Sequence, residues 1–144
     1  MRSKAPLVMM EQMVMLLVFA LAAALCLQAF TKSDALSARS EARDRAVTLV
    51  QSSVETVRHC GGDTDQALRS AAELLECQYE EEVLWANYDA EWNPCLDGVY
   101  HLTVRADSGG VPGLNQVRAA VETDGEVLFE LKAAWQGEVD AHEG

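Results

Sequence analysis

The sequence predicts an α+β protein in which a long N-terminal, membrane-spanning α-helix packs on a four-stranded antiparallel β-meander with one short extra helix. Three observations predict this fold. The first sixty residues contain no glycine and a single proline, Pro6, so nothing after that proline breaks a helix. They begin with a strongly apolar span. From Glu82 onward, apolar residues recur at every second position, which is the period of half-buried strands.

A transmembrane helix is expected over residues 7–31, after a basic leader at residues 1–6. Gln12 to Thr31 is twenty residues without a charge, the length that crosses the hydrocarbon core of a bilayer. Arg2 and Lys4 precede this span, whereas the charges that follow it nearly cancel. The positive-inside rule therefore predicts a single-pass protein of the cell membrane, with a cytoplasmic N-terminus and an extracytoplasmic head.

Two kinds of removable signal fit this segment less well. A secretory signal needs a small residue three positions before its cut, and a cut after Ala29 has Leu27 there. A lipoprotein signal needs a small residue before its cysteine, and Cys26 follows Leu25. We therefore expect the segment to be retained.

Residues 32–60 are expected to continue the helix as an amphipathic extension. Spacings of three and four define one apolar stripe, formed by Leu36, Val47, Val50, Val54 and Val57 with Ala35, Ala38, Ala42 and Ala46 beside them. The repeat is too short and too rich in alanine for a coiled coil, so the stripe should pack on the chain's own head. Arg58 and His59 followed by Gly61-Gly62 predict the helix end.

Residues 61–144 are expected to form a small α+β head. Asp63 and Gln66 resemble a capping box that opens a short helix ending near Cys77. Strands are predicted over 83–88, 99–106, 117–121 and 127–135, with Val127 on the apolar side of the last one. Asp124-Gly125 predicts a two-residue hairpin turn.

Charge is unevenly distributed along the chain. Residues 1–60 hold seven Lys/Arg against five Asp/Glu, whereas residues 61–144 hold four against eighteen, a net charge of −14. Because so acidic a head repels phosphate backbones, we expect no nucleic-acid binding.

The cysteines allow at most one disulfide in the head. Cys26 lies in the apolar span, and of the other three, Cys60 and Cys77 flank the short helix and are the better-placed pair; free thiols fit the sequence equally well. The spacing lacks a Cys-x-x-Cys pair, so we expect no metal site and no cofactor.

The head offers no motif of an enzyme. Asp89, Glu91, Asn93 and Asp97 resemble calcium ligands, but the glycine and closing glutamate of a calcium loop are missing, and Asn-Pro and Asp-Gly turns explain the composition. No nucleophile motif is present, so we expect a non-enzymatic protein. Trp92, in this loop, is the tryptophan best placed for a contact with another molecule.

The basic leader, the apolar helix with Glu11 near its start and the sheet that follows together resemble the type IV pilin and pseudopilin family. In that family a glutamate is fifth in the mature chain, which aligns Leu7-Val8-Met9-Met10-Glu11 with the mature N-terminus. The resemblance implies cleavage of the leader between Pro6 and Leu7, where the family has glycine in place of Pro6, and methylation of the new amine. It also implies that Glu11 neutralises a neighbour's terminal amine.

The implied function is that of a structural subunit of a type IV pilus, type II secretion or competence-type filament. Its partners would be other pilin-like subunits and a membrane assembly platform. An alternative is a single-pass envelope scaffold of the cell-division type that pairs through its extracellular helix.

Overall fold

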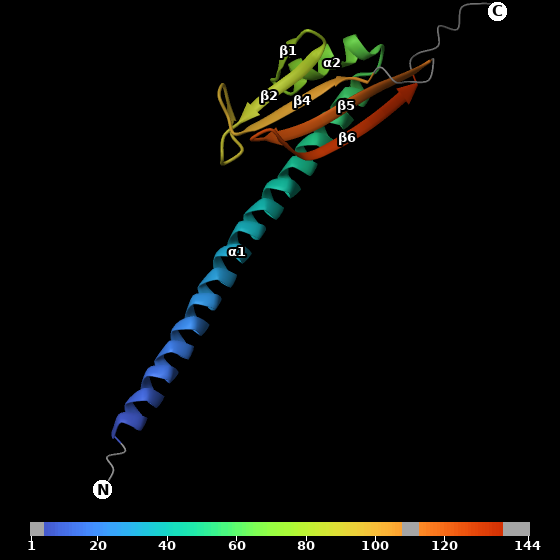
Figure 1. The fold of residues 1–144 in the computed structure, drawn as a ribbon. Helices are drawn as coiled ribbons and strands as arrows, with labels where there is room; N and C mark the ends of the chain where they lie inside the picture. Colours follow the sequence, from blue (N-terminus) through green and yellow to red (C-terminus); the bar gives the residue numbers. More distant parts are fainter. Residues whose placement is uncertain (1–4, 108–112, 137–144) are drawn as a thin grey trace, which may run out of the picture. The chain divides into compact units, whose positions relative to one another are not determined.

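The computed structural model describes residues 5–107 and 113–136 (Figure 1). The chain divides into two compact units, Met1–Glu41 and Ala42–Gly144. The first unit holds the first part of helix α1 (Ala5–Cys60), and the second holds the last turns of α1, helix α2 (Thr64–Leu74) and a β-sheet.

Helix α1 is continuous from Ala5 to Cys60, as the absence of glycine predicts. Arg58 and His59 lie in its last turn, where cations stabilise the helix dipole. Gly61 and Gly62 follow with φ values of 62° and 76°, a left-handed conformation that glycine adopts without steric cost. The predicted helix end is therefore confirmed.

In the first unit every side chain from Pro6 to Glu41 is exposed. This includes Leu36, which is 69% exposed, so its predicted place in the packed stripe is wrong. The apolar N-terminal part of α1 is long enough and apolar enough to cross a membrane.

In the second unit the packed stripe of α1 consists of Ala46, Val50, Val54 and Val57, none more than 3% exposed. These residues join one core cluster with the inner face of the sheet. Burying each valine contributes about 1.5–3 kcal/mol, so the stripe fixes the last turns of α1 to the sheet. Ser53 is buried in the same stripe, where its Oγ donates a hydrogen bond to the carbonyl oxygen of Leu49 at 2.8 Å.

Helix α2 covers part of the same sheet face, because its buried residues belong to the same core cluster. It begins as predicted: Oδ1 of Asp63 accepts a hydrogen bond from the backbone N–H of Gln66 at 2.7 Å. It ends at Leu74, slightly before the predicted end at Cys77.

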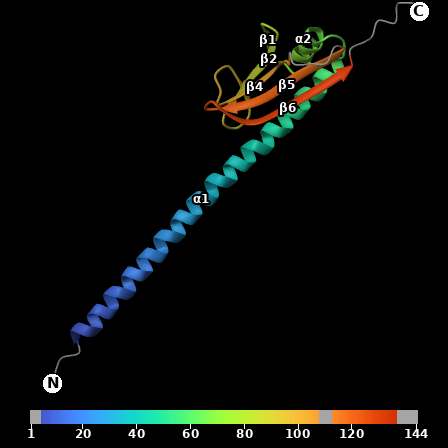
Figure 2. The ribbon, with the colours of Figure 1, turned by 45° about the vertical axis from the view of Figure 1, so that its right-hand side comes forward.

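The sheet is antiparallel, but it has six strands rather than the predicted four. In chain order they are β1 (Gln78–Glu80), β2 (Val83–Tyr88), β3 (Pro94–Cys95), β4 (Tyr100–Ala106), β5 (Leu114–Thr123) and β6 (Glu126–Gln136). The spatial order is β1-β2-β4-β5-β6, with β3 paired to β2 (Figure 2). Asp124 and Gly125, with φ values of 50° and 76°, form the predicted turn between β5 and β6.

Strand β1 was missed because its turn has unusual residues. Glu81 and Glu82 join β1 to β2 with φ values of 50° and 64°. Such turns normally contain Asn-Gly or Asp-Gly, so Glu-Glu gives no hairpin signal.

Strand β3 was missed because two residues are too few to show a period. The chain returns from it to β4 very close to β2. A Cβ atom at Gly98 would collide with the carbonyl oxygen of Tyr88, so this position requires glycine.

The predicted orientation of Val127 is also wrong. The pairing of β5 with β6 shifts between Val121 and Glu122, which places Val127 opposite Glu122 and leaves it 48% exposed. Leu128 packs against the core instead. A β-bulge inserts an extra residue into one strand, so simple alternation fails on one side of it.

We expect Glu82→Gly to stabilise the second unit. A left-handed backbone costs a non-glycine residue about 1–2 kcal/mol, and removing this cost outweighs the roughly 0.4–1 kcal/mol by which glycine stabilises the unfolded chain. The thermal midpoint of the full-length protein in detergent micelles, followed by near-UV circular dichroism, should rise by about 4–8 °C per kcal/mol gained.

Glu91→Gly is the matched control, because Glu91 has no left-handed backbone to relieve. The same exchange there should lower the midpoint by loosening the unfolded chain. A midpoint of Glu82→Gly at or below that of the natural protein would contradict the turn assignment.

Candidate functional site

Glu11 lies on α1 beside the apolar side chains of Leu7, Met10, Val14 and Met15. These four are between 58% and 75% exposed. Among residues 5–107 and 113–136, no hydrogen bond or ion pair involves the Glu11 carboxylate. Within the described part of the chain, the acid therefore projects from an apolar helix surface and has no ion pair.

The carboxylate of Glu11 could bind a cation. A carboxylate in an apolar environment costs several kcal/mol unless a cation or hydrogen-bond donors compensate it. A cation from another chain would remove this cost. The arrangement suits binding between chains.

Pro6 and Leu7 lie in the first turn of α1. Proline is favoured there because its missing N–H would have no partner within the helix. Leu7 and Glu11 are four residues apart and so share one face of the helix. Cleavage between Pro6 and Leu7 stays a prediction.

Cys60 and Cys77 both pack against the core cluster, and all four cysteines are free. The predicted disulfide between them is not formed in this structure. Burial raises the pKa of the Cys77 thiol, and its Sγ lies 3.5 Å from the carbonyl oxygen of Leu75, to which it donates. Because the thiolate is the reactive form, the raised pKa lowers the reactivity of the Cys77 thiol.

The loop between β2 and β4 is organised by Asp89. Its Oδ1 accepts hydrogen bonds from the backbone N–H groups of Asn93 at 2.8 Å and Glu91 at 3.0 Å. These bonds, led by the one from Asn93, lower the pKa of Asp89. The carboxylate thus holds a turn, which is the reading that the Asn-Pro and Asp-Gly pairs favour.

Trp92, predicted as the residue to test for outside contacts, packs within the head. It stacks on Tyr100 with ring centroids 4.0 Å apart. Leu96 and Val99 are exposed apolar residues of this loop, at 90% and 45% exposure. The sequence pattern did not indicate that Trp92 would be packed and Leu96 exposed.

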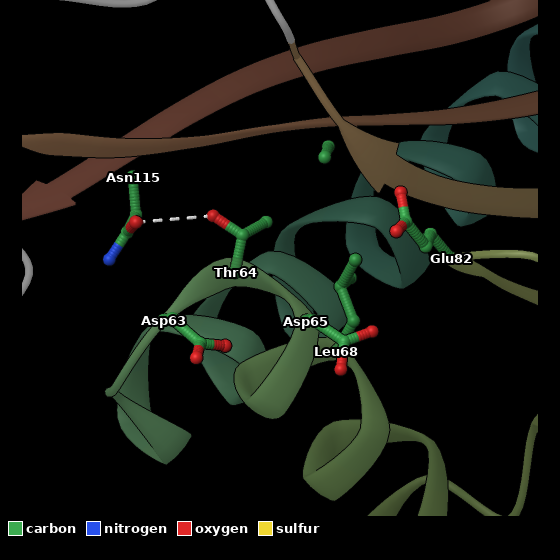
Figure 3. A pocket seen from close by; sticks show the side chains of 7 residues that line it. Asp63, Thr64, Asp65, Leu68, Glu82 and Asn115 are labelled. Atoms are coloured by element: carbon green, nitrogen blue, oxygen red, sulfur yellow. Dashed lines mark hydrogen bonds between the residues drawn. The ribbon is translucent and has the colours of Figure 1, made fainter. Parts of the chain in front are cut away.

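A cleft of about 350 Å³ lies in the second unit (Figure 3), lined by Asp63, Thr64, Asp65, Leu68, Glu82, Ala106 and Asn115. Asp63 caps α2, and Asp65 accepts hydrogen bonds from the Tyr79 hydroxyl and from Arg69 at 3.3 Å. The Thr64 hydroxyl donates to Oδ1 of Asn115 at 3.2 Å, an amide oxygen that cannot act as a base. The Thr64 hydroxyl is therefore hydrogen-bonded to a group that is not a base. Within the described residues, no three His, Cys, Asp or Glu side chains gather as for a metal.

Three of the four Lys/Arg residues after position 60 form a row on the outer face of the sheet. Pairing places Arg105 opposite Arg118, and Arg118 opposite Lys132. Like charges directly opposite each other on neighbouring strands repel and destabilise the sheet. The carboxylate of Asp107 offsets this repulsion: one of its oxygens lies 3.0 Å from Nζ of Lys132 and the other 3.5 Å from the guanidinium of Arg118. The hydrogen bond from Lys132, with the charges of both cations, lowers the pKa of Asp107. These three residues are far apart in the sequence and come together only through the register of the strands, so the sequence pattern did not predict the row.

We expect Asp107→Asn to lower the free energy of unfolding at neutral pH and much less at acid pH. The pKa of Asp107 is lower in the folded protein than in the unfolded chain. Its stabilising effect is therefore complete above the unfolded value of about 3.9 and is lost as pH falls through the folded value. Urea unfolding at about pH 7 and about pH 2.5 measures the difference.

Asp97→Asn, which removes an exposed loop carboxylate, is the control and should behave alike at both pH values. If Asp107→Asn lowered stability equally at both, the ion pairs would not be the cause.

Comparisons of the chain with protein families, with curated proteins and with solved structures find no match. The function must therefore follow from the residues themselves. Of the features above, the apolar part of α1 with Glu11 is the one that points to a task outside the chain.

Proposed function

We propose that this protein is a membrane-anchored structural subunit, similar to pilins and pseudopilins, which assembles with other such subunits through the apolar part of α1. The observation that carries the proposal is Glu11: a carboxylate on an exposed apolar helix surface, without a partner in the described part of the chain. A helix that served only as an anchor would gain nothing from this acid.

Membrane insertion is supported by the surface of α1. Monomeric soluble proteins rarely expose contiguous apolar patches larger than a few hundred Å². Here the large apolar side chains from Leu7 to Phe30 are all exposed. Lipid would cover them, and Arg2 and Lys4 favour a cytoplasmic N-terminus.

Assembly is supported by the energetics of Glu11. If subunits leave the bilayer and pack their apolar helices together, the carboxylate is buried among apolar side chains. It then needs a cation from a neighbour, which would be a terminal amine after leader cleavage or Lys4 in an uncleaved chain. Removing one partner of a buried ion pair costs about 3–5 kcal/mol. Neighbouring α1 helices would therefore pack stably only in the register that brings Glu11 to its cation.

The remaining features fit a structural subunit. The acidic head would keep assembled subunits soluble, and the Thr64 hydroxyl in its cleft is hydrogen-bonded to a group that is not a base. Helices drawn out of a bilayer need machinery to extract them, so the partners we propose are like subunits and a membrane assembly platform. A type IV pilus, a type II secretion system or a competence filament would supply both.

We expect Glu11→Ala to leave membrane insertion intact and to abolish assembly. The substitution removes a costly charge from the apolar segment, so resistance to carbonate extraction should persist. The assembled fraction, measured by co-purification with the assembly machinery from native membranes, should fall about a hundredfold or more, as a loss of about 3 kcal/mol requires.

Gln12→Ala is the matched control, because it removes a neighbouring polar side chain that carries no charge. It should assemble normally. Normal assembly of Glu11→Ala would remove the role assigned to Glu11.

We also expect the intact mass of the protein from its native membrane to show loss of Met1 to Pro6 and addition of one methyl group. Pro6→Gly, which restores the residue that the family has at this position, should raise the processed fraction. A full-length chain in both cases would favour the envelope scaffold instead.

A further inference from the structure

The outer face of the sheet carries a hollow. In the second unit the last turns of α1 and helix α2 both pack on the inner face, with which they form the core cluster. The hollow on the other face measures about 270 Å³ and is lined by Val83, Thr103, Arg105, Arg118, Ala120, Glu122 and Glu130. Pockets for drug-sized ligands measure roughly 300–1,000 Å³, so this hollow suits a smaller molecule.

Strand register gives the hollow its floor and walls. Thr103 of β4 lies opposite Ala120 of β5, and Ala120 lies opposite Glu130 of β6. Arg105 lies opposite Arg118 at one end. Ala120 is only 6% exposed and ends in a methyl group, so the longer side chains around it stand higher than it does. Ala120 therefore forms the floor.

Arg105 supplies an unpaired cation to this hollow. The other three Lys/Arg residues of the head, Arg69, Arg118 and Lys132, each lie 3.0–3.6 Å from a carboxylate. Within residues 5–107 and 113–136, no hydrogen bond or ion pair involves the Arg105 guanidinium. The guanidinium can therefore bind an anion from outside the chain.

Glu122 supplies an unpaired anion at the other end. Its carboxylate is half-buried and has no hydrogen bond or ion pair in the described part of the chain. The residue opposite it on β4 is His101, whose Nδ1 lies 2.8 Å from Oδ1 of Asn87 instead. The hollow thus has one available charge of each sign.

The separation of these two charges indicates the length of a ligand that reaches both. Arg105 faces Arg118, and Glu122 lies four residues further along β5. Four residues span about 13 Å of a strand and the next strand lies about 4.8 Å away, so the two Cα atoms are roughly 14 Å apart. Side chains stand roughly perpendicular to a sheet, so the charged groups have a similar separation. Two charge-assisted hydrogen bonds of about 2.8 Å leave roughly 8–9 Å between them.

We propose that this hollow binds a short peptide of two or three residues with both ends free. Extended residues span about 3.3–3.6 Å each, so two or three of them fill the gap. The Arg105 guanidinium would donate two parallel hydrogen bonds to the terminal carboxylate. The Glu122 carboxylate would accept hydrogen bonds from the terminal ammonium group. The Thr103 hydroxyl lies between them, where a peptide group of the ligand would meet it.

The test is binding of alanine peptides to the full-length protein in detergent micelles, measured by isothermal titration calorimetry. Dialanine or trialanine should bind saturably, and single alanine, which is too short to reach both charges, about tenfold more weakly or less. Acetylation of the amino end and amidation of the carboxyl end should each weaken binding about tenfold, because each removes hydrogen bonds between charged groups.

Two substitutions assign the ends of the peptide. Arg105→Gln should weaken binding of the free dipeptide about tenfold and leave binding of the amidated one unchanged, since that peptide has no carboxylate to lose. Glu122→Gln should weaken binding of the free dipeptide and leave the acetylated one unchanged. A misfolded variant would lose both peptides, so this crossed pattern separates binding from folding.

Arg69→Gln and Glu91→Gln are the matched controls, because they make the same exchanges at exposed positions outside the hollow. Both should bind like the natural protein. Absence of saturable binding, equal binding of free and blocked dipeptides, or natural affinity in Arg105→Gln and Glu122→Gln would overturn the inference. The hollow lies in the second unit and involves neither Glu11 nor the leader, so this outcome would leave the assembly proposal untouched.

Discussion

The contact between the last turns of α1 and the inner face of the sheet is the constraint on which the rest of the structure depends. Val50, Val54 and Val57 close a core that α2 and three sheet strands share, and without them the apolar face of the sheet would be open to water. The apolar stripe of α1 from Ala46 onward is therefore buried against the sheet. The apolar side chains of α1 before Ala42 all stay exposed and can meet lipid or other helices.

That earlier part of α1 has a different character. Its apolar side chains are exposed on all sides, which is the pattern of a helix surrounded by an apolar medium. From Leu7 to Thr31, Glu11 is the only charged residue of this part. Under the function proposed here, the Glu11 carboxylate would make the segment an element that selects its neighbours, because only a correctly placed cation would offset the cost of burying it. The last turns of α1 would thus hold the head through its core, and the first part would join the assembly through the charge pair of Glu11.

Much of the fold could be predicted because helices and alternating strands leave periodic patterns. The extent of α1, the cap at Asp63, strand β2 and the Asp124-Gly125 turn all followed from local rules. Two failures in the sheet depend on pairing between strands. The bulge that reverses Val127 and Leu128 and the row of cations on the outer face are set by register, which a single chain read in order does not display. The turn at Glu81 and Glu82 was missed because these residues give no hairpin signal, and Leu36 was misplaced because the helical stripe continues beyond the part that packs on the sheet. For the candidate site, the sequence located Glu11, and the structure showed which apolar side chains lie beside it.

Chemical labelling can test whether the first part of α1 lies in lipid while the last turns lie against the sheet. Single-cysteine variants from Gln12 to Val57, in a background lacking the natural cysteines, can be labelled with a water-soluble maleimide in native membranes. We expect no labelling from Gln12 to Thr31, labelling of every position just beyond Lys32, and protection only along the Ala46–Val57 stripe thereafter. Uniform labelling from Gln12 to Thr31 would contradict it, because the apolar segment would then lie in water.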